Sequence, residues 1–528
     1  MAANDGVQFS NEFMAWNAGI CRRYRKADAP EPIGGKVLSA AACKNEDVPF
    51  QLAAAGTDGG AHVRVKCSAL VSEEGEIPAD AWRVRFVDYV RCAEQGFVAD
   101  VVGDGESRAL AASVVQPIWL TLRLPKYVHR GRYTGTVEVC CDRAPAVVFR
   151  VELEVLHAQL PEGPDARFYL DLWQHPAAIA RWHHVPLWSE AHWELVAAYT
   201  RLLEEAGQKP ITACIIHDPW ASQTFDPHES MVKWIRQPDG AFAFDFSVFD
   251  QYVELCFEQG LPGPINCYSI AMGPGSRLDC PIRYWDAQDA AYRSLECCVG
   301  DAVYGEAWGQ FFEAFVPHLE RMGWLDNVCI AVDEAREEKM RGMLAVVPAE
   351  LSVALAGNYH ESLDARLRDY SVIYPGAPAA VCARRREQGK TTTFYTCCEP
   401  AHPNTFCFSP LIESRLIAWH ALAHNADGYL RWAFTSWPES PENCADYGPW
   451  PSGDAFLVYP GPKSSLRFEM LKKGIQDFEA WHIARKRSHD DPRLDEAIAR
   501  ANADHDGRSF DPAELEAARV LVNDILRI

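Results

Sequence analysis

The sequence has little positive charge and no long apolar run. It carries 51 lysine and arginine residues against 73 aspartate and glutamate residues, a formal net charge of −22. Binding to nucleic acid needs a basic face for the phosphates, so this balance argues against a nucleic-acid partner. A membrane-spanning helix needs roughly 18 or more consecutive apolar residues, and a signal peptide needs a shorter apolar segment near the N-terminus. Neither is present, so we expect a cytoplasmic protein with no membrane partner.

The common phosphate-binding and zinc-binding motifs are also missing. The sequence contains no G-x-G-x-x-G, no G-x-x-x-x-G-K-[ST] and no C-x-x-C. Its 18 cysteines occur as adjacent pairs, such as Cys397-Cys398, or inside apolar runs, as Cys329 does. Thiols in apolar runs behave as small hydrophobic side chains. We therefore expect reduced cysteines and no metal site.

The chain of 528 residues is long enough for two domains. Residues 116–125, 131–141 and 147–156 alternate apolar and polar side chains, with glycine and proline between the runs. Short strands at this spacing are typical of a β-sandwich. The segment Leu160–Arg167 is rich in proline, glycine and charge, as linkers often are. We predict a β-sandwich domain over residues 1–160 and a second domain over 161–528.

The second domain alternates short apolar runs with longer helical patterns. This alternation predicts a (β/α)8 barrel. A doubly wound sheet is the alternative, but such a sheet more often has a glycine-rich turn after its first strand. Two further helices are expected over 466–487 and 511–528. The predicted strands are residues 168–173, 211–216, 264–270, 328–332, 351–356, 370–374, 392–397 and 428–434.

Aromatic, histidine and carboxylate side chains follow most of these strands. In a barrel the carboxyl ends of the strands surround the active site, so such residues should converge. Indole rings suit the apolar face of a sugar, and carboxylates suit its hydroxyl groups. Each tryptophan has core packing as its alternative role. The candidates for substrate binding are Trp173, His175, Asp218, Trp220, Tyr268, Tyr395, Trp432 and Trp437.

Two adjacent carboxylates, Asp333 and Glu334, end the fourth predicted strand, Val328–Val332. They have a simple structural explanation, because acidic residues stabilise the first turn of a helix. The functional alternative is a catalytic pair. Successive residues of a strand point to opposite faces, so two neighbours can share a pocket only where the strand breaks into a loop. Two carboxyl groups this close should raise one pKa, which suits a general acid.

Several longer segments, in one order, resemble glycoside hydrolase family 123, the exo-β-N-acetylgalactosaminidase family. They are QPIWLTLRLPKYVHRGRYTGTVEV, FYLDLWQHP, EEAGQKPITACIIHDPW, DEAREEKM, FYTCCEPAHPNTF, GYLRWAFTSWPE and GDAFLVYPGP. The resemblance covers most of the chain. It implies an N-terminal β-sandwich, a (β/α)8 barrel, and a retaining hydrolase of β-linked N-acetylgalactosamine or a related N-acetylhexosamine.

The resemblance also implies roles for individual residues. Asp333 orients the substrate's 2-acetamido group, whose oxygen attacks the anomeric carbon, and it stabilises the oxazolinium-like charge. Glu334 protonates the departing oxygen and then deprotonates water. Tyr395 is the candidate to hydrogen-bond the acetamido group from across the barrel. The mechanism needs no metal and no cofactor, and the partner is a glycan or glycoconjugate; a homo-oligomer is compatible with the sequence.

Two other functions stay open at this point. A carbohydrate-binding scaffold would hold a glycan without cleaving it, but binding alone does not require paired acids. An ordinary two-carboxylate glycosidase would act on a different sugar. It would need a second acid from another strand, such as Glu399 or Asp218.

Overall fold

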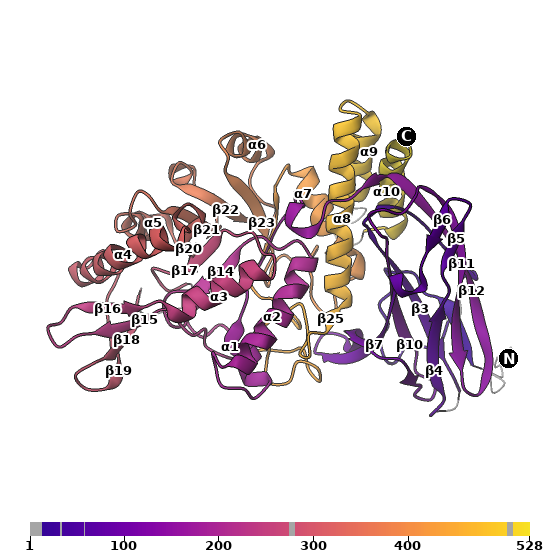
Figure 1. The fold of residues 1–528 in the computed structure, drawn as a ribbon, viewed down its shortest axis with the longest axis horizontal. Coiled ribbons are helices and arrows are strands. Elements are labelled where there is room, and N and C mark those ends of the chain that lie inside the picture. The colour runs from indigo at the N-terminus through magenta and orange to yellow at the C-terminus, as the bar shows by residue number, and fades with distance from the viewer. Residues whose placement is uncertain (1–12, 32–33, 58, 274–279, 504–509) are drawn as a thin grey trace, which may run out of the picture.

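The computed structural model describes residues 13–31, 34–57, 59–273, 280–503 and 510–528. Figure 1 shows two regions side by side: β-sheets built from the N-terminal residues, and a mixed α/β region built from the rest. The long helix α8 (Leu466–Arg487) stands between them. Within the described ranges, none of the helices combines the length and the apolar character that crossing a membrane requires.

The N-terminal region consists of two sheets that enclose a common apolar core. Side chains from both sheets meet in this core, among them Leu52, Phe86, Leu120, Val137 and Val151. The alternation of apolar and polar residues in the sequence therefore places one face of each strand inside. One sheet has the order β1 (Met14–Asn17), β3 (Asp47–Ala55), β10 (Gln116–Arg123), β7 (Trp82–Cys92), β8 (Gly96–Asp104) and β25 (Ser464–Ser465). The other contains β2 (Val37–Lys44), β12 (Ala144–Gln159), β11 (Gly131–Cys141), β4 (His62–Cys67), β9 (Arg108–Ala109), β5 (Leu70–Ser72) and β6 (Gly75–Ile77).

The α/β region contains one sheet of eight parallel strands. Each of these strands overlaps one of the ranges predicted from the apolar runs, so the predicted strands are confirmed. The sheet curls as the sheet of a barrel does (Figure 1). Its order is β13 (Tyr169–Leu172), β24 (Gly428–Arg431), β23 (Thr391–Tyr395), β22 (Leu367–Ile373), β21 (Ser352–Gly357), β20 (Val328–Asp333), β17 (Ile265–Tyr268) and β14 (Ile211–Cys214).

Backbone groups and two glutamine side chains join the two outermost strands of this sheet, β13 and β14. The backbone amide of Lys209 donates to the carbonyl of Leu170 over 2.9 Å, beside an isolated parallel β-bridge between Leu170 and Gln208. The Leu172 amide donates to the side-chain oxygen of Gln208 over 2.8 Å, and the Thr212 amide donates to that of Gln174 over 2.7 Å. The glutamines thus satisfy backbone groups that an open sheet edge would leave unpaired.

Helices follow most strands of the curled sheet. Ser189 caps the start of α2, where its side-chain oxygen accepts a hydrogen bond from the His192 amide. The α-helices are α1 (Pro176–Trp182), α2 (Glu190–Glu205), α3 (Ser247–Glu258), α4 (Ala302–Met322), α5 (Glu337–Leu344), α6 (Ala379–Glu387), α7 (Leu411–Ala423), α8, α9 (Pro492–Ala501) and α10 (Pro512–Leu526). Short 3-10 helices are η1 (Ala79–Ala81), η2 (Gly163–Asp165), η3 (Leu325–Asn327) and η4 (Glu361–Leu363).

A small additional sheet was not predicted. It has the order β16 (Phe242–Asp245), β15 (Lys233–Arg236), β18 (Ile282–Asp286) and β19 (Ala291–Leu295). Its strands have four or five residues each and are largely half-buried or exposed, so they form no continuous apolar run like those of the equally short, buried strands of the curled sheet. Trp234 attaches the sheet to α4 by stacking on Phe311, with ring centroids 5.1 Å apart.

The two regions are joined by a strand pairing as well as by the chain itself. β25, which follows the curled sheet in sequence, pairs with β8 of the N-terminal region. The last strand of the N-terminal sheets, β12, ends at Gln159, and the first strand of the curled sheet, β13, begins at Tyr169. The predicted domain boundary at residue 160 lies between these strands and stays a prediction.

Candidate active site

The paired carboxylates lie where β20 ends. Asp333 is the last residue of the strand and still pairs with Ala356 of β21. Glu334 leaves the strand with a φ of +40°, in the left-handed region that side chains other than glycine rarely adopt. Its amide donates to the carbonyl of Ala356 over 2.7 Å, which holds this turn in place. The turn breaks the up-and-down alternation of the strand, and both carboxyl groups line the same pocket.

That pocket measures about 590 Å³ including its open mouth, a size suited to a sugar residue. It lies at the carboxyl ends of β13, β20, β21, β23 and β24. Five of the residues predicted from the sequence line it: Trp173, Asp333, Glu334, Tyr395 and Trp432.

Three aromatic rings pack together beside Asp333. The ring centroids of Trp173, Trp220 and Tyr268 lie 4.7–5.0 Å from one another. Of the three, only Trp173 is itself part of the pocket wall. The indole N–H groups of Trp173 and Trp220 are buried and have no hydrogen-bond partner in the part of the chain that the structure describes. Of the two, only Trp173 lines the pocket, so only Trp173 can contact a ligand there.

The two carboxyl groups differ in their surroundings. Burial, followed by the neighbouring Glu334 carboxylate, raises the pKa of Asp333 well above its usual range, while the Trp220 indole opposes the shift. Glu334 is the more exposed of the two. The Tyr395 hydroxyl donates to Oε1 of Glu334 over 2.9 Å. Burial and the Glu334 carboxylate raise the pKa of Tyr395, which keeps this hydroxyl protonated as a donor.

His175 and Trp437 are buried near the site but do not line the pocket. His175 stacks on His228 with ring centroids 3.4 Å apart, and its Nδ1 lies 3.0 Å from the Ser436 hydroxyl oxygen. Burial lowers the pKa of His175 to about 3. The Trp437 indole donates to the carbonyl of Val458 over 2.7 Å. Both side chains are thus used in packing, and their predicted part in substrate binding stays a prediction.

Asp218, in the loop after β14, also lies outside the pocket wall. Its Oδ2 accepts hydrogen bonds from the amide and the hydroxyl of Ser222, over 2.8 and 2.9 Å. Asp218 and Glu399, the residues considered as a second catalytic acid, are both absent from the lining of this pocket.

Several lining residues were not predicted. Cys397 and Cys398 follow β23 directly, but as thiols they gave no sign of sugar chemistry. Trp450 and Asp454 come from the long loop between β24 and β25, far from any predicted strand end. Gln223 comes from the loop after β14. Reading only the residues next to each strand end could not find the contributions of the longer loops.

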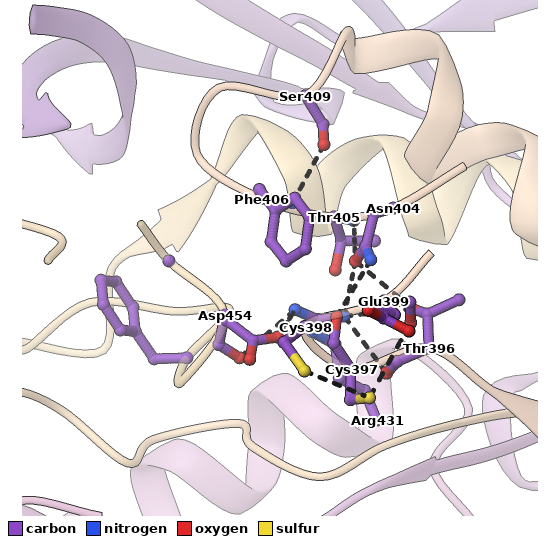
Figure 2. A network of polar contacts seen from close by, with 12 residues as sticks. Thr396, Cys397, Cys398, Glu399, Asn404, Thr405, Phe406, Ser409, Arg431 and Asp454 are labelled. Atoms are coloured by element: carbon purple, nitrogen blue, oxygen red, sulfur yellow. Dashed lines mark hydrogen bonds and ion pairs between the residues drawn. The ribbon is translucent and has the colours of Figure 1, made fainter. Parts of the chain in front are cut away.

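Asp454 is anchored by Arg431, the last residue of β24. Arg431 Nη2 donates to Oδ1 of Asp454 over 2.6 Å. The other terminal nitrogen of Arg431 donates to the side-chain oxygens of Asn404 and Thr396, over 2.9 and 3.1 Å. Figure 2 shows Arg431 between Asp454 on one side and Thr396 and Asn404 on the other. Among the described residues, no group of three or more His, Cys, Asp or Glu side chains is placed to hold a metal ion.

Comparison with known proteins defines the class to which this fold and pocket belong. A family model for the catalytic domain of glycoside hydrolase 123 matches residues 173–484, and one for the glycoside hydrolase 123 N-terminal domain matches residues 18–141. The first match covers more than half of the chain. The chain therefore belongs to glycoside hydrolase family 123, as the resemblance in the sequence implied, and it is a glycosidase by class.

One solved structure agrees with this fold over nearly the whole chain. A family 123 glycoside hydrolase from Clostridium perfringens, studied for glycolipid glycan hydrolysis, is 22% identical with a TM-score of 0.86, over 98% of this chain and 97% of that one. A family 5 xyloglucanase from Bacteroides ovatus is 8% identical with a TM-score of 0.29, over 83% of this chain and 98% of that one, which is too distant to bear on the fold. None of the curated proteins compared with the chain matches it.

Proposed function

We propose that the protein removes terminal β-linked N-acetylgalactosamine, or a related N-acetylhexosamine, from a glycoconjugate with retention of configuration. The observation that carries this proposal is the left-handed turn at Glu334, which brings two adjacent carboxyl groups into one sugar-sized pocket. The family membership supports a glycosidase, and the Clostridium perfringens relative, studied for glycolipid glycan hydrolysis, supports a glycoconjugate as substrate.

Asp333 suits the role of orienting the acetamido group. Burial raises its pKa, and no lysine or arginine is among the described residues that line the pocket. A positive charge develops in the pocket only when the acetamido oxygen attacks the anomeric carbon and an oxazolinium-like ring forms. Asp333 therefore stabilises the transition state more than the bound substrate, which is the condition for catalysis. The aromatic ring of Trp173, packed against Trp220 and Tyr268, offers the acetamido methyl group an apolar surface.

Glu334 suits the role of general acid and base. It is more exposed than Asp333, so it can exchange protons with a departing oxygen and with incoming water. Tyr395 binds one of its oxygens and fixes the orientation of the carboxyl group. The carboxyl group whose pKa burial raises is that of Asp333. In this scheme the positive charge that develops on the reacting sugar stabilises the ionised form of Asp333, whose pKa is raised in the free protein.

A two-carboxylate mechanism is the alternative that one observation favours, because Asp454 is a third carboxyl group in the same pocket. The ion pair between Asp454 and Arg431 argues against Asp454 as the nucleophile, since the arginine already stabilises the carboxylate charge before the reaction begins. A thiazoline analogue of the acetamido sugar separates the two mechanisms. Tight competitive inhibition is expected for participation of the acetamido group, and indifference to the analogue would exclude it.

The substrate class is tested with aryl glycosides. We expect turnover of the β-N-acetylgalactosaminide or the β-N-acetylglucosaminide and no turnover of the β-galactoside, which lacks the acetamido nucleophile. Release of product with the β-configuration, followed by NMR, tests retention. Turnover of the plain galactoside at a similar rate would show that the acetamido group takes no part.

A further inference from the structure

Asp454 has one carboxylate oxygen that the protein leaves unused. Oδ1 accepts the hydrogen bond from Arg431, and both side chains are buried with at most 1% of their surface exposed. Oδ2 is buried as well and has no hydrogen-bond partner in the described part of the chain. Asp454 nevertheless belongs to the pocket wall. A buried acceptor without a partner is costly, so a site that keeps one facing a pocket is suited to a ligand donor.

The anchoring network keeps this oxygen in place. Arg431 is held by Thr396 and Asn404, and the Asn404 amide in turn donates to the carbonyls of Cys397 and Pro400, over 3.0 and 2.7 Å (Figure 2). Burial raises the pKa of Asp454, and Arg431 opposes that shift. A rigid carboxylate in the wall of a pocket is preorganised to accept a hydrogen bond.

A complementary donor lies beside it. The indole N–H of Trp432, the residue after Arg431, is buried without a hydrogen-bond partner among the described residues, and Trp432 also lines the pocket. The indole lies beside the Asp454 carboxyl group and lowers its pKa. A hydroxyl group both accepts and donates, so one sugar hydroxyl can satisfy the indole and the carboxylate together.

The strand order indicates which end of the sugar lies next to Asp454 and Trp432. β24, which carries Arg431 and leads into Trp432, lies four strands from β20 in either direction around the sheet of eight. The Asp454–Trp432 pair is thus across the barrel from Asp333 and Glu334. In the proposed function those acids hold C1 and C2 of the sugar, so the far side of the ring, with C4 and C6, points toward Asp454.

We propose that Asp454 and Trp432 jointly bind one hydroxyl of the terminal sugar, at C4 or at C6, and so set the sugar specificity of the enzyme. This inference rests on the proposed function, because the acids define which end of the sugar faces them. If the hydroxyl is the one at C4, the pair selects between its axial and equatorial positions, and thus between galactosamine and glucosamine.

The test compares parent, 3-deoxy, 4-deoxy and 6-deoxy aryl glycosides of the preferred N-acetylhexosamine, with the wild type and with Asp454→Asn. Wild-type turnover of the parent glycoside tests the proposed function by itself. A hydrogen bond to a charged group contributes about 10- to 100-fold. We expect the wild type to prefer the parent over the 4-deoxy or the 6-deoxy glycoside by about that factor in kcat/KM.

The variant should lose this preference for the same hydroxyl and keep its response to the 3-deoxy glycoside. Comparing the two proteins on each glycoside cancels the intrinsic reactivity change that a missing hydroxyl causes. Trp432→Phe keeps an aromatic ring but removes the N–H, and it should weaken the same preference. Glu439→Gln is the matched control, because Glu439 is an exposed carboxylate in the same loop, and it should behave as the wild type.

Three results would overturn the inference. The first is a wild type that treats the 4-deoxy and 6-deoxy glycosides like the parent, which needs no variant and so does not depend on whether Asp454→Asn folds. The second is a folded Asp454→Asn that keeps the full wild-type preference. The third is a complete loss of turnover on every glycoside by this variant together with indifference of the wild type to the thiazoline, which would make Asp454 a nucleophile.

Discussion

Buried carboxylates occur in two regions of the molecule, and they differ in what faces them. Between the N-terminal sheets and helices α8 and α10, Asp100 contacts Arg467 at 2.9 Å, Glu469 contacts Arg85 at 2.9 Å and Glu46 contacts Arg519 at 2.8 Å. Although burial alone would raise them, these arginines hold the pKa values of the three carboxyl groups below their usual range.

At the pocket the same residue type has the opposite character. The pocket wall next to Asp333 contains no arginine or lysine in the described part of the chain, and the pKa of Asp333 is raised. The contrast teaches that burial of a carboxyl group does not by itself indicate function. A paired carboxylate joins two regions of the fold, and an unpaired one keeps a free-energy cost that a substrate can relieve.

Removing the unpaired acids should have the largest effect. We expect Glu334→Gln to lose about 10³- to 10⁴-fold in kcat on substrates with poor leaving groups, and less on activated aryl glycosides, which need little protonation. Asp333→Asn should slow both kinds of substrate, because charge stabilisation is lost whatever the leaving group. Steady-state kinetics on a paired set of glycosides measures this, and full activity of Asp333→Asn would show that the roles are assigned wrongly.

Breaking a paired carboxylate should instead cost stability. Arg467→Ala leaves Asp100 buried without its closest cation and should lower the free energy of unfolding by about 3–5 kcal/mol. Urea-induced unfolding measures the change. Arg527→Ala, which removes an exposed pair with Glu154, is the matched control and should cost at most about 1 kcal/mol. Equal costs for the two variants would contradict the comparison.

The hydrogen bond between Tyr395 and Glu334 should have a smaller effect. Tyr395→Phe removes a donor to the proposed general acid and base and keeps the ring in place. We expect kcat to fall by about 10- to 100-fold, with little change in the free energy of unfolding. An unchanged kcat would show that Tyr395 only packs against the site.

The smallest effect expected is on stability at the site itself. The pKa of Asp333 is raised, so the folded protein binds this proton more tightly than the unfolded chain does, and ionisation of Asp333 costs stability above the unfolded pKa of about 3.9. Asp333→Asn should therefore be more stable than the wild type by about 1 kcal/mol at pH 8, with the gain vanishing below pH 4.

Asp100→Asn sharpens the comparison, because the sign reverses. The pKa of Asp100 is lowered, so its stabilising contribution is present above the unfolded pKa and is lost as the pH falls through the folded one. This variant should be less stable than the wild type at pH 8, and the deficit should shrink in acid. Unfolding free energies at the two pH values measure both effects, and the same sign for both variants would refute the distinction.

Much of the α/β region was predictable because its signals are local. All eight strands of the curled sheet lie where apolar runs predicted them. The small sheet around Trp234 was missed, since its strands are largely half-buried or exposed and form no apolar run, and the sheet packs on α4. Five predicted site residues reach the pocket, whereas Trp437 and His175, which also follow strands, are used in packing.

The amino-acid sequence by itself determined that Asp333 and Glu334 follow a buried strand, because an apolar run that stops at two charges is a property of neighbouring residues. Only the tertiary structure decided that both side chains enter one pocket, since this depends on the left-handed turn at Glu334 and its bond to Ala356. It also decided that Asp454, which lies 120 residues beyond Glu334 in the chain, lines the same pocket. Contacts between distant segments are set by packing, and no local pattern encodes them.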